Sequence, residues 1–174
     1  MTIETMNIRI ATTADSPIIA LVHVEAWRVA YRGLMPDAVL NALDVGRHTA
    51  SWQNRLAEFQ GSVFVSEGGG KITGFCVLMS SRDKGVDPRS VAEIAAINIL
   101  PAHWRTGIGR TICNCAIEAA RRNGYKHLTH WVLALNCRAR IFYEAMGFAL
   151  DGATKSERAS DGSELSEVRF HITL

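Results

Sequence analysis

A glycine-containing turn between an apolar strand and an amphipathic helix constrains this chain more than any other feature. The turn is Trp104-Arg105-Thr106-Gly107-Ile108-Gly109-Arg110, which follows the strand-like run Ile94 to Leu100 and opens a helical stretch, Ile108 to Arg122. The first N–H groups of a helix have no partner within the helix and carry partial positive charge. Glycines let an anion approach the backbone without a Cβ in the way. The segment therefore predicts a binding site for a phosphate-bearing cofactor.

The glycines alone do not identify the cofactor. A Walker loop requires Gly-Lys followed by Ser or Thr, but Arg110 and Thr111 follow Gly109 here. A dinucleotide fingerprint requires a third glycine at the position that Ile112 occupies. A pyrophosphate cradle for coenzyme A and an ordinary tight turn between strand and helix both remain open on this segment alone.

A second informative segment runs from Asn136 to Phe148, after the strand-like run Leu128 to Leu135. Asn136 is suited to cap a helix at its N-terminus, and Gly147 is suited to end that helix. Four apolar residues recur at the spacing of one helix face, namely Ala139, Phe142, Tyr143 and Met146. Taken alone, the segment indicates only an amphipathic core helix.

Together, the two segments resemble the GNAT superfamily of N-acetyltransferases. The first is similar to the family's pyrophosphate motif, in which Arg or Gln precedes x-x-Gly-x-Gly or Ala. The second matches Asn-x-x-Ala-x-x-Phe-Tyr-Glu-x-x-Gly-Phe at every named position, and Ala92 to Pro101 is similar to the family's fourth strand. Trp104 is a departure, because it stands where Arg or Gln is usual. It leaves open whether Arg105 or Arg110 supplies the charge that faces the phosphates.

The order of predicted elements agrees with the fold of that family, an α/β fold with a central mixed β-sheet flanked by helices. The resemblance implies that strands four and five are parallel and splay apart. We expect helices from a cap at Thr12 or Thr13 to Gly33 and over 36–43, 46–58, 107–123 and 137–146. We expect strands at 7–11, 62–67, 71–79, 91–100, 128–135, 148–150 and 167–173. The predicted apolar face of the first helix is Ile18, Ile19, Val22, Ala26 and Val29.

A long polar stretch, residues 151–166, is expected to form a mobile loop between the last two strands. In the third helix, Trp52 and Leu56 are expected to point inward.

The resemblance also implies how acetyl-CoA is held. Backbone N–H groups of the turn would bind the pyrophosphate, the edge of the fourth strand would pair with the pantetheine arm, and a backbone N–H there would face the thioester oxygen. The implied cofactor-binding residues are Ile97, Asn98, Ile99, Trp104, Arg105, Thr106, Gly107, Ile108, Gly109, Arg110, Asn136, Ala139, Phe142 and Tyr143. The implied reaction is a direct acetyl transfer to an amine, without a metal.

Two residues are candidates for proton transfer. Tyr143 is the candidate general acid, because a phenol with a pKa of about 10 is protonated at neutral pH and can donate to a departing thiolate. The alternative is a core aromatic. Glu93 is the candidate base for the attacking amine, and a period of two places it on the same strand face as Ile97. An exposed glutamate in an ion pair, with a water chain as the base, is the alternative for this position.

Trp27 and Tyr31 are the candidate acceptor-binding residues. Their segment resembles a group of bacterial GNAT proteins with Trp-x-x-x-Tyr-Arg-Gly-x-x-Pro, which includes polyamine and other small-amine acetyltransferases. Aromatic rings can enclose a cationic amine, but the same two rings could simply pack a helix onto the sheet. A non-catalytic CoA-binding or sensing domain and a protein N-terminal acetyltransferase are the alternative functions.

The bulk properties limit the remaining classes. With 174 residues and 48% hydrophobic content, the chain is expected to be a single N-acetyltransferase domain over 1–174. A net charge of +2 gives no argument for nucleic acid, no apolar run reaches the length of a membrane span, and Met1 to Ile10 lacks the features of a signal peptide. Four cysteines without zinc spacing are expected to be small buried hydrophobes in a reducing cytoplasm: Cys76, Cys113, Cys115 and Cys137. A homodimer is left open.

Overall fold

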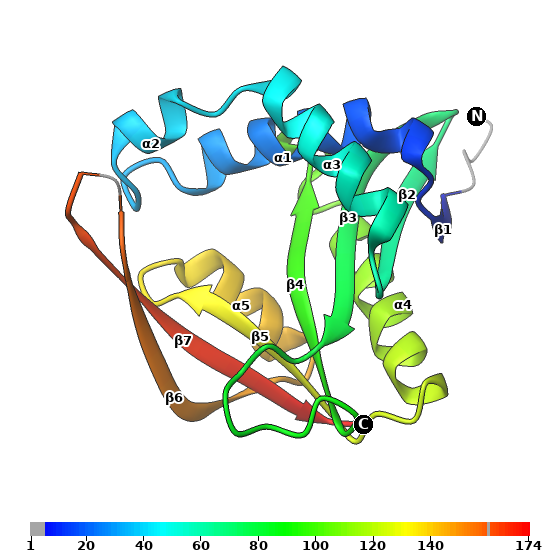
Figure 1. Cartoon of the computed structure of the whole chain (residues 1–174), viewed down its shortest axis with the longest axis vertical. Coiled ribbons are helices and arrows are strands. Elements are labelled where there is room, and N and C mark those ends of the chain that lie inside the picture. The colour runs from blue at the N-terminus through cyan, green and yellow to red at the C-terminus, as the bar shows by residue number, and fades with distance from the viewer. Residues whose placement is uncertain (1–5, 160) are drawn as a thin grey trace.

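The chain folds around one mixed sheet of seven strands in the order β1-β2-β3-β4-β5-β7-β6 (Figure 1). The structure is a computed structural model that describes residues 6–159 and 161–174. Residues 1–5, the start of the segment without signal-peptide features, and Ser160, in the predicted polar loop, lie outside the described residues. Among the seven strands, β4 and β5 are parallel, and every other neighbouring pair is antiparallel. The predicted fold class is confirmed.

The elements follow one another along the chain much as the sequence predicts. The strands are β1 (Asn7–Ile10), β2 (Ser62–Gly68), β3 (Lys71–Ser80), β4 (Val91–Ile99), β5 (His127–Leu133), β6 (Ala149–Arg158) and β7 (Glu164–Thr173). The α-helices are α1 (Ser16–Ala30), α2 (Asp37–Asn41), α3 (Val45–Glu58), α4 (Ile108–Arg122) and α5 (Cys137–Ala145). Two short 3₁₀ turns, η1 (Thr13–Asp15) and η2 (Pro101–His103), precede α1 and follow β4.

Helices cover both faces of the sheet and divide the core into two clusters. On one face, α1 and α3 bury Ile19, Val22 and Trp52 against β2 and β3. On the other face, α4 and α5 pack Ile112 and Tyr143 against β4, β5 and β7. The inward position of Trp52 is confirmed, and Leu56 packs against the same cluster. This two-sided burial leaves the carboxyl ends of β4 and β5 between the helix layers, where the candidate site lies.

The predicted apolar face of α1 is wrong at both ends. Ile18 and Val29 are 41% and 43% exposed, whereas Ala20 and Val24 are buried. The reason is that α1 packs against α3 as well as against the sheet. This second contact rotates the buried stripe toward Ala20 and Val24, and the sequence of α1 does not report it.

The expected mobile loop over 151–166 is also wrong. Most of it belongs to the long hairpin of β6 and β7, in which Lys155 faces Glu167 and Arg158 faces Glu164. Strand β6 lies at the edge of the sheet and is exposed on both faces, so it lacks the apolar alternation by which a strand is normally predicted. Figure 1 shows this hairpin reaching up toward α2.

Three of the four cysteines are buried or half-buried, and one is exposed. Cys76 and Cys113 are buried and Cys115 is half-buried, but Cys137 is exposed, which corrects its predicted burial. Cys137 is the first residue of α5, where the helix emerges at the surface. Among the described residues, no helix combines the length and the apolar character that crossing a bilayer requires.

Candidate functional site

A cavity of about 1160 Å³ lies where β4 and β5 diverge. It is bounded by the end of α1, the second half of β4, the turn before α4, the helix α5 and the β6–β7 hairpin. Fourteen of the predicted site residues line it: Trp27, Tyr31, Ile97, Asn98, Ile99, Trp104, Arg105, Gly107, Gly109, Arg110, Asn136, Ala139, Phe142 and Tyr143. Thr106, Ile108 and Glu93 do not. Segments that are far apart in the sequence therefore meet at one site.

The two central strands splay apart inside this cavity. Pairing between β4 and β5 ends at Glu93 and Thr129, although β4 continues to Ile99 and β5 to Leu133. Residues of β4 beyond Ile94 therefore keep their pairing with β3 on one edge and have no strand on the other. An unpaired edge of this kind can take up an extended, amide-containing chain as an added strand.

A β-bulge in β4 changes the direction in which Glu93 points. Leu78 pairs with Ile94 and Val77 pairs with Ala96, so Ala95 has no opposite residue on β3. Ala92, Ile94, Ile97 and Ile99 all pack in the cluster on the α4 side. Glu93 lies between two of them and faces the other side. The predicted shared face of Glu93 and Ile97 is therefore wrong, because the bulge inverts the alternation.

The turn before α4 leaves helix N–H groups open to the cavity. Gly107 precedes the helix with φ of 92° and no side-chain cap, and a Cβ at this position would meet nothing within 4 Å. The first N–H groups of α4 therefore have no helical partner and face a space that an anion can enter. Thr106 donates its hydroxyl to the His103 carbonyl at 2.7 Å, and the Ile108 side chain is in the core. Only their backbone groups are available to a ligand.

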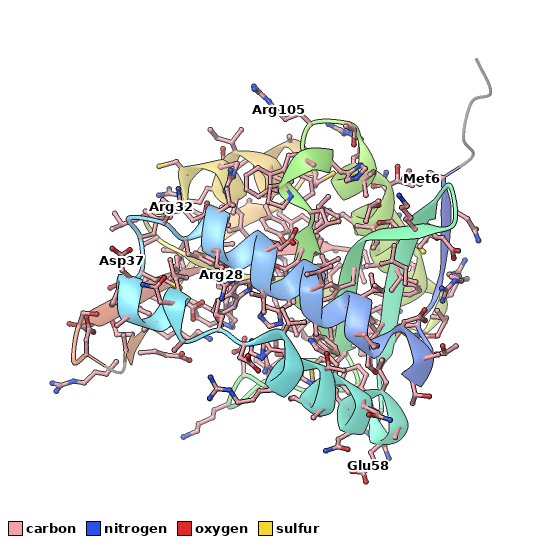
Figure 2. The ribbon with its side chains drawn as sticks, turned by 90° about the horizontal axis from the view of Figure 1, so that it is seen from above. Met6, Arg28, Arg32, Asp37, Glu58 and Arg105 are labelled. Carbon is pink, nitrogen blue, oxygen red and sulfur yellow. The ribbon has the colours of Figure 1, made fainter. Side chains whose placement is uncertain are left out.

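Three arginines and one tryptophan surround this turn. Arg105 has φ of 64°, and Figure 2 shows its side chain projecting away from the body of the protein. Trp104 donates its indole N–H to the Ile99 carbonyl at 2.8 Å, which fixes the ring beside the end of β4. The guanidinium carbon of Arg138 lies 3.8 Å from the centre of that ring. Arg110 lies on the first turn of α4.

The helix α5 presents Asn136 and Tyr143 to the cavity. The Asn136 side-chain oxygen accepts the Ala139 N–H at 3.1 Å, which confirms the predicted cap. Tyr143 is 3% exposed and packs against the rings of Phe142, Phe148 and Phe170. Burial raises the pKa of Tyr143 well above its ordinary value. The phenol therefore keeps its proton at neutral pH.

His130 is a cavity residue that the sequence analysis missed. It follows Thr129, the last residue of β5 that pairs with β4, and its Nδ1 lies 2.5 Å from the Ile94 carbonyl. Because a carbonyl only accepts, Nδ1 carries a proton, and Nε2 of the neutral ring is an acceptor. Burial lowers the pKa of His130 to about 4, and its ring centre lies 4.4 Å from that of Tyr143. Nothing in the local sequence marks this histidine, because its position depends on where the strands separate.

A second, polar pocket of about 580 Å³ adjoins the cavity and shares Trp131 and Glu157 with it. Glu93 lines this pocket, is 2% exposed and is paired with Arg82. The exposed glutamate of the alternative interpretation is therefore wrong, although its ion pair is present. The Trp131 indole N–H donates to Asp83 at 3.0 Å.

The acceptor-side candidates lie together on the cavity wall. The rings of Trp27 and Tyr31 are 4.9 Å apart and roughly perpendicular, and both line the cavity. The β6–β7 hairpin contributes Glu157, Leu165 and Glu167 to the same wall. Burial raises the pKa of Tyr31, and the nearby Glu167 adds to this effect. Glu157 and Leu165 were missed because residues 151–166 were predicted as a loop. Glu167 begins the predicted strand 167–173, but its position on the cavity wall depends on how that strand pairs in the sheet.

Known proteins match this chain over most of its length. A model of the acetyltransferase (GNAT) family matches residues 26–148. YuaI of Bacillus subtilis (strain 168), named as an uncharacterized N-acetyltransferase, is 29% identical over 168 residues, which cover 95% of this chain and 88% of YuaI. An uncharacterized N-acetyltransferase of Archaeoglobus fulgidus is 30% identical over 159 residues, which cover 91% of this chain and 100% of that protein. The structure of yncA from Salmonella typhimurium, described with its cofactor acetyl-CoA, is similar with a TM-score of 0.72 at 23% identity, over 97% of this chain and 94% of that one.

Proposed function

This chain belongs to the acetyltransferase (GNAT) family and is an N-acetyltransferase; we propose that it transfers an acetyl group from acetyl-CoA directly to the primary amine of a small molecule. The observation that carries the proposal is the single cavity in which an open helix N-terminus, a free strand edge and a buried tyrosine meet an acceptor wall of aromatic and acidic side chains. When bound, acetyl-CoA supplies a thioester whose carbonyl carbon an amine can attack.

The residues of the cavity fit coenzyme A. The free N–H groups after Gly107 suit the pyrophosphate. The space beside the Gly107 Cα is open, so no side chain prevents an anion from reaching these N–H groups. The edge of β4 at Ile97, Asn98 and Ile99 has no strand partner among the described residues, although the Ile99 carbonyl already accepts the Trp104 indole N–H. This edge suits the amide groups of the pantetheine arm. Holding the two reactants in alignment can contribute up to ~7–11 kcal/mol to rate acceleration.

Tyr143 would act as the general acid. Its hydroxyl keeps a proton because burial raises its pKa, and its ring is fixed by surrounding aromatic side chains. A phenol in this state can donate its proton to a departing thiolate sulfur as the C–S bond breaks. The competing interpretation, a core aromatic, agrees with the burial but not with the position of Tyr143 on the cavity wall.

Glu93 would remove the proton from the amine through a water molecule. The water is required because Glu93 lines the polar pocket and not the main cavity, while Trp131 and Glu157 border both. Arg82 donates to both carboxylate oxygens of Glu93. This pairing holds the Glu93 carboxylate in place at the wall of the polar pocket.

The acceptor wall favours a small amine with a cationic group, as in a polyamine. Tyr31 offers an aromatic face, and Glu157 and Glu167 offer carboxylates to the same cavity. The Trp131 ring already carries a cation, with Lys155 Nζ 4.7 Å from its centre. Lys155 lies 3.0 Å from Glu167 and would be displaced by, or share, a bound cation. The proposed acceptor is therefore an amine whose second positive charge replaces that of Lys155.

A thiol-release assay with acetyl-CoA and a panel of acceptors tests this function. The panel holds a polyamine, a monoamine, an α-amino acid and a peptide with a free N-terminus, and Tyr143→Phe is the matched control. Thiol release that depends on the polyamine or the monoamine supports the proposal. Release only with the peptide would indicate a protein N-terminal acetyltransferase. A sensing domain would be indicated if the protein binds acetyl-CoA but releases no thiol with any acceptor of the panel. In that case, a metabolite extract incubated with the protein and labelled acetyl-CoA should also give no labelled product.

A further inference from the structure

The Arg138 guanidinium lies beside the turn that precedes α4, over the ring of Trp104. The Arg138 guanidinium carbon is 3.8 Å from the centre of the Trp104 ring, so the group is stacked on the ring face. Both residues line the cavity. Among the residues that the structure describes, no carboxylate lies within ion-pair distance of Arg138, whereas Arg9, Arg82 and Arg169 each pair with a carboxylate that their own chain supplies.

Trp104 holds this guanidinium in place. Its indole N–H donates to the Ile99 carbonyl at 2.8 Å, so the ring is attached to the end of β4 and cannot turn freely. A guanidinium stacked on an aromatic face keeps its N–H groups in the plane parallel to the ring, directed outward. Arg138 is also the second residue of α5, two positions after Asn136, which caps that helix. The stacked pair therefore joins the turn before α4 to the start of α5.

The other two arginines are placed differently. The Arg105 side chain projects away from the protein in Figure 2, and Arg110 is the third residue of α4. Arg138 is thus the guanidinium that the fold immobilises beside the turn. Trp104 stands at the position that holds Arg or Gln in similar motifs. In the structure, Arg138 of α5 places a guanidinium beside Trp104 and so supplies a positive charge near that position.

We propose that Arg138, held by stacking on Trp104, binds a phosphate group of acetyl-CoA. The proposal rests on acetyl-CoA as the cosubstrate. A guanidinium can form two parallel N–H···O bonds to a phosphate, and such charge-assisted bonds are stronger than neutral ones. The free Arg138 head and the open N–H groups of α4 would then bind the same polyanion from two sides.

The test is direct measurement of acetyl-CoA binding by calorimetry. Arg138→Gln should weaken binding about 10- to 100-fold, the range expected when a hydrogen-bonded charged partner is removed. Arg138→Lys keeps the charge and should recover part of the loss. Arg121→Gln is the control, because it removes an arginine from the far end of α4, where Arg121 pairs with Glu118 outside the cavity. It should bind acetyl-CoA as the wild type does.

A rescue experiment separates a binding role from a structural one. Trp104→Arg in the Arg138→Gln background returns a guanidinium to the turn and should restore most of the affinity. Salt should weaken binding less steeply in Arg138→Gln than in the wild type, because one phosphate contact is lost. 3′-Dephospho-CoA then identifies the phosphate: the effect of Arg138→Gln persists with this ligand if the pyrophosphate is the partner and disappears if the 3′-phosphate is.

Two results would overturn the assignment. If folded Arg138→Gln binds acetyl-CoA within about twofold of the wild type, with the same salt dependence, Arg138 is not a phosphate ligand. If Arg138→Lys binds as weakly as Arg138→Gln and the rescue variant, confirmed as folded by its melting curve, gains nothing, the effect is not one of charge. A wild-type protein that does not bind acetyl-CoA would overturn the proposed function itself, and this inference with it.

Discussion

The proposed cofactor-binding and acceptor-binding parts of the cavity offer a ligand different kinds of groups. At the proposed cofactor end, the groups available to a ligand are mainly backbone N–H and C=O groups, held by the start of α4, the free edge of β4 and the cap of α5. At the proposed acceptor end, they are the tips of side chains from α1, β5 and the β6–β7 hairpin. Backbone groups survive substitution, whereas side-chain tips change with each mutation. The difference suits a protein that combines a fixed cosubstrate with an adjustable acceptor site.

The first prediction tests whether the cofactor end depends on backbone access. Gly107→Asp should abolish detectable acetyl-CoA binding, because it places a side chain and a negative charge where an anion would enter. Gly107 also has φ of 92°, which side-chain-bearing residues rarely adopt. Calorimetry measures the affinity and a melting curve confirms folding. Gly124→Asp is the control for strain, since Gly124 has φ of 82° and ends the same helix far from the cavity.

Unchanged affinity in a folded Gly107→Asp protein would mean that the anion does not approach this turn. Equal loss of binding in Gly124→Asp would attribute the effect to strain in α4 and not to a blocked site.

The second prediction concerns the one side chain at the cofactor end that the proposal requires for chemistry. Tyr143→Phe should lower kcat by about 10²- to 10⁴-fold, the usual contribution of a general acid. Acetyl-CoA affinity should hardly change, because the ring and its contacts with Phe142, Phe148 and Phe170 remain. Steady-state kinetics and calorimetry together measure both quantities. A kcat equal to that of the wild type would return Tyr143 to the role of a core aromatic.

The same division explains what could be predicted from sequence. The cofactor end depends on local signals, in which Gly107, Asn136 and Gly147 each act through the backbone of their own segment, and the structure confirms the elements they begin or end. The bulge at Ala95 was not predicted, because it exists only in the pairing of β4 with β3. One unpaired residue was enough to turn Glu93 to the other face.

The acceptor end depends on contacts between distant segments, which short sequence patterns do not report. Strand β6 is exposed on both faces, so the pattern of residues 151–166 indicated a loop. Glu157 was therefore missed. Glu167 begins the predicted strand 167–173, but its place on the cavity wall depends on how that strand pairs with β5 and β6. His130 and the contact between Arg138 and Trp104 were missed for the same reason, since each depends on a tertiary approach between elements. The assignments of acceptor residues remain predictions.

The third prediction tests the acceptor end. Tyr31→Ala should raise the KM for the amine by about tenfold and leave the KM for acetyl-CoA nearly unchanged, because removing uniform binding of one substrate spares turnover. Trp27→Ala should act in the same direction. Trp27 also packs against His23, with ring centres 5.0 Å apart, so the melting temperature of the Trp27→Ala variant must be measured first. A residue that is wholly core would cost about 3–5 kcal/mol on truncation.

A large fall in the melting temperature of Trp27→Ala, with unchanged kinetics in the folded fraction, would make Trp27 structural. If Tyr31→Ala also leaves the amine KM unchanged, the acceptor would bind in the polar pocket around Glu93 and Arg169 instead.

The last and smallest effect concerns the helix layer that supports the acceptor end. His23 on α1 stacks on His48 of α3 with ring centres 4.7 Å apart, and His23 Nδ1 and His48 Nε2 are buried without a hydrogen-bond partner among the described residues. Burial, with the neighbouring His48 and Arg55, lowers the pKa of His23 from 6.5 to about 4. The folded protein therefore binds the proton less readily than the unfolded chain does. The contribution of a neutral His23 is fully present above about pH 6.5 and is lost as the pH falls toward 4.

His23→Phe keeps an aromatic ring between α1 and α3 but removes the titration, so the melting temperature of this variant should fall less between pH 6.5 and 4 than that of the wild type. For a domain of this size, each kcal/mol corresponds to roughly 2–4 °C. His130 also has a pKa lowered to about 4, so part of the acid sensitivity should remain in the variant. The difference between the two melting series therefore isolates His23. Parallel series would show that the contact between α1 and α3 does not sense pH, and that the layer beneath Trp27 is held by its apolar contacts alone.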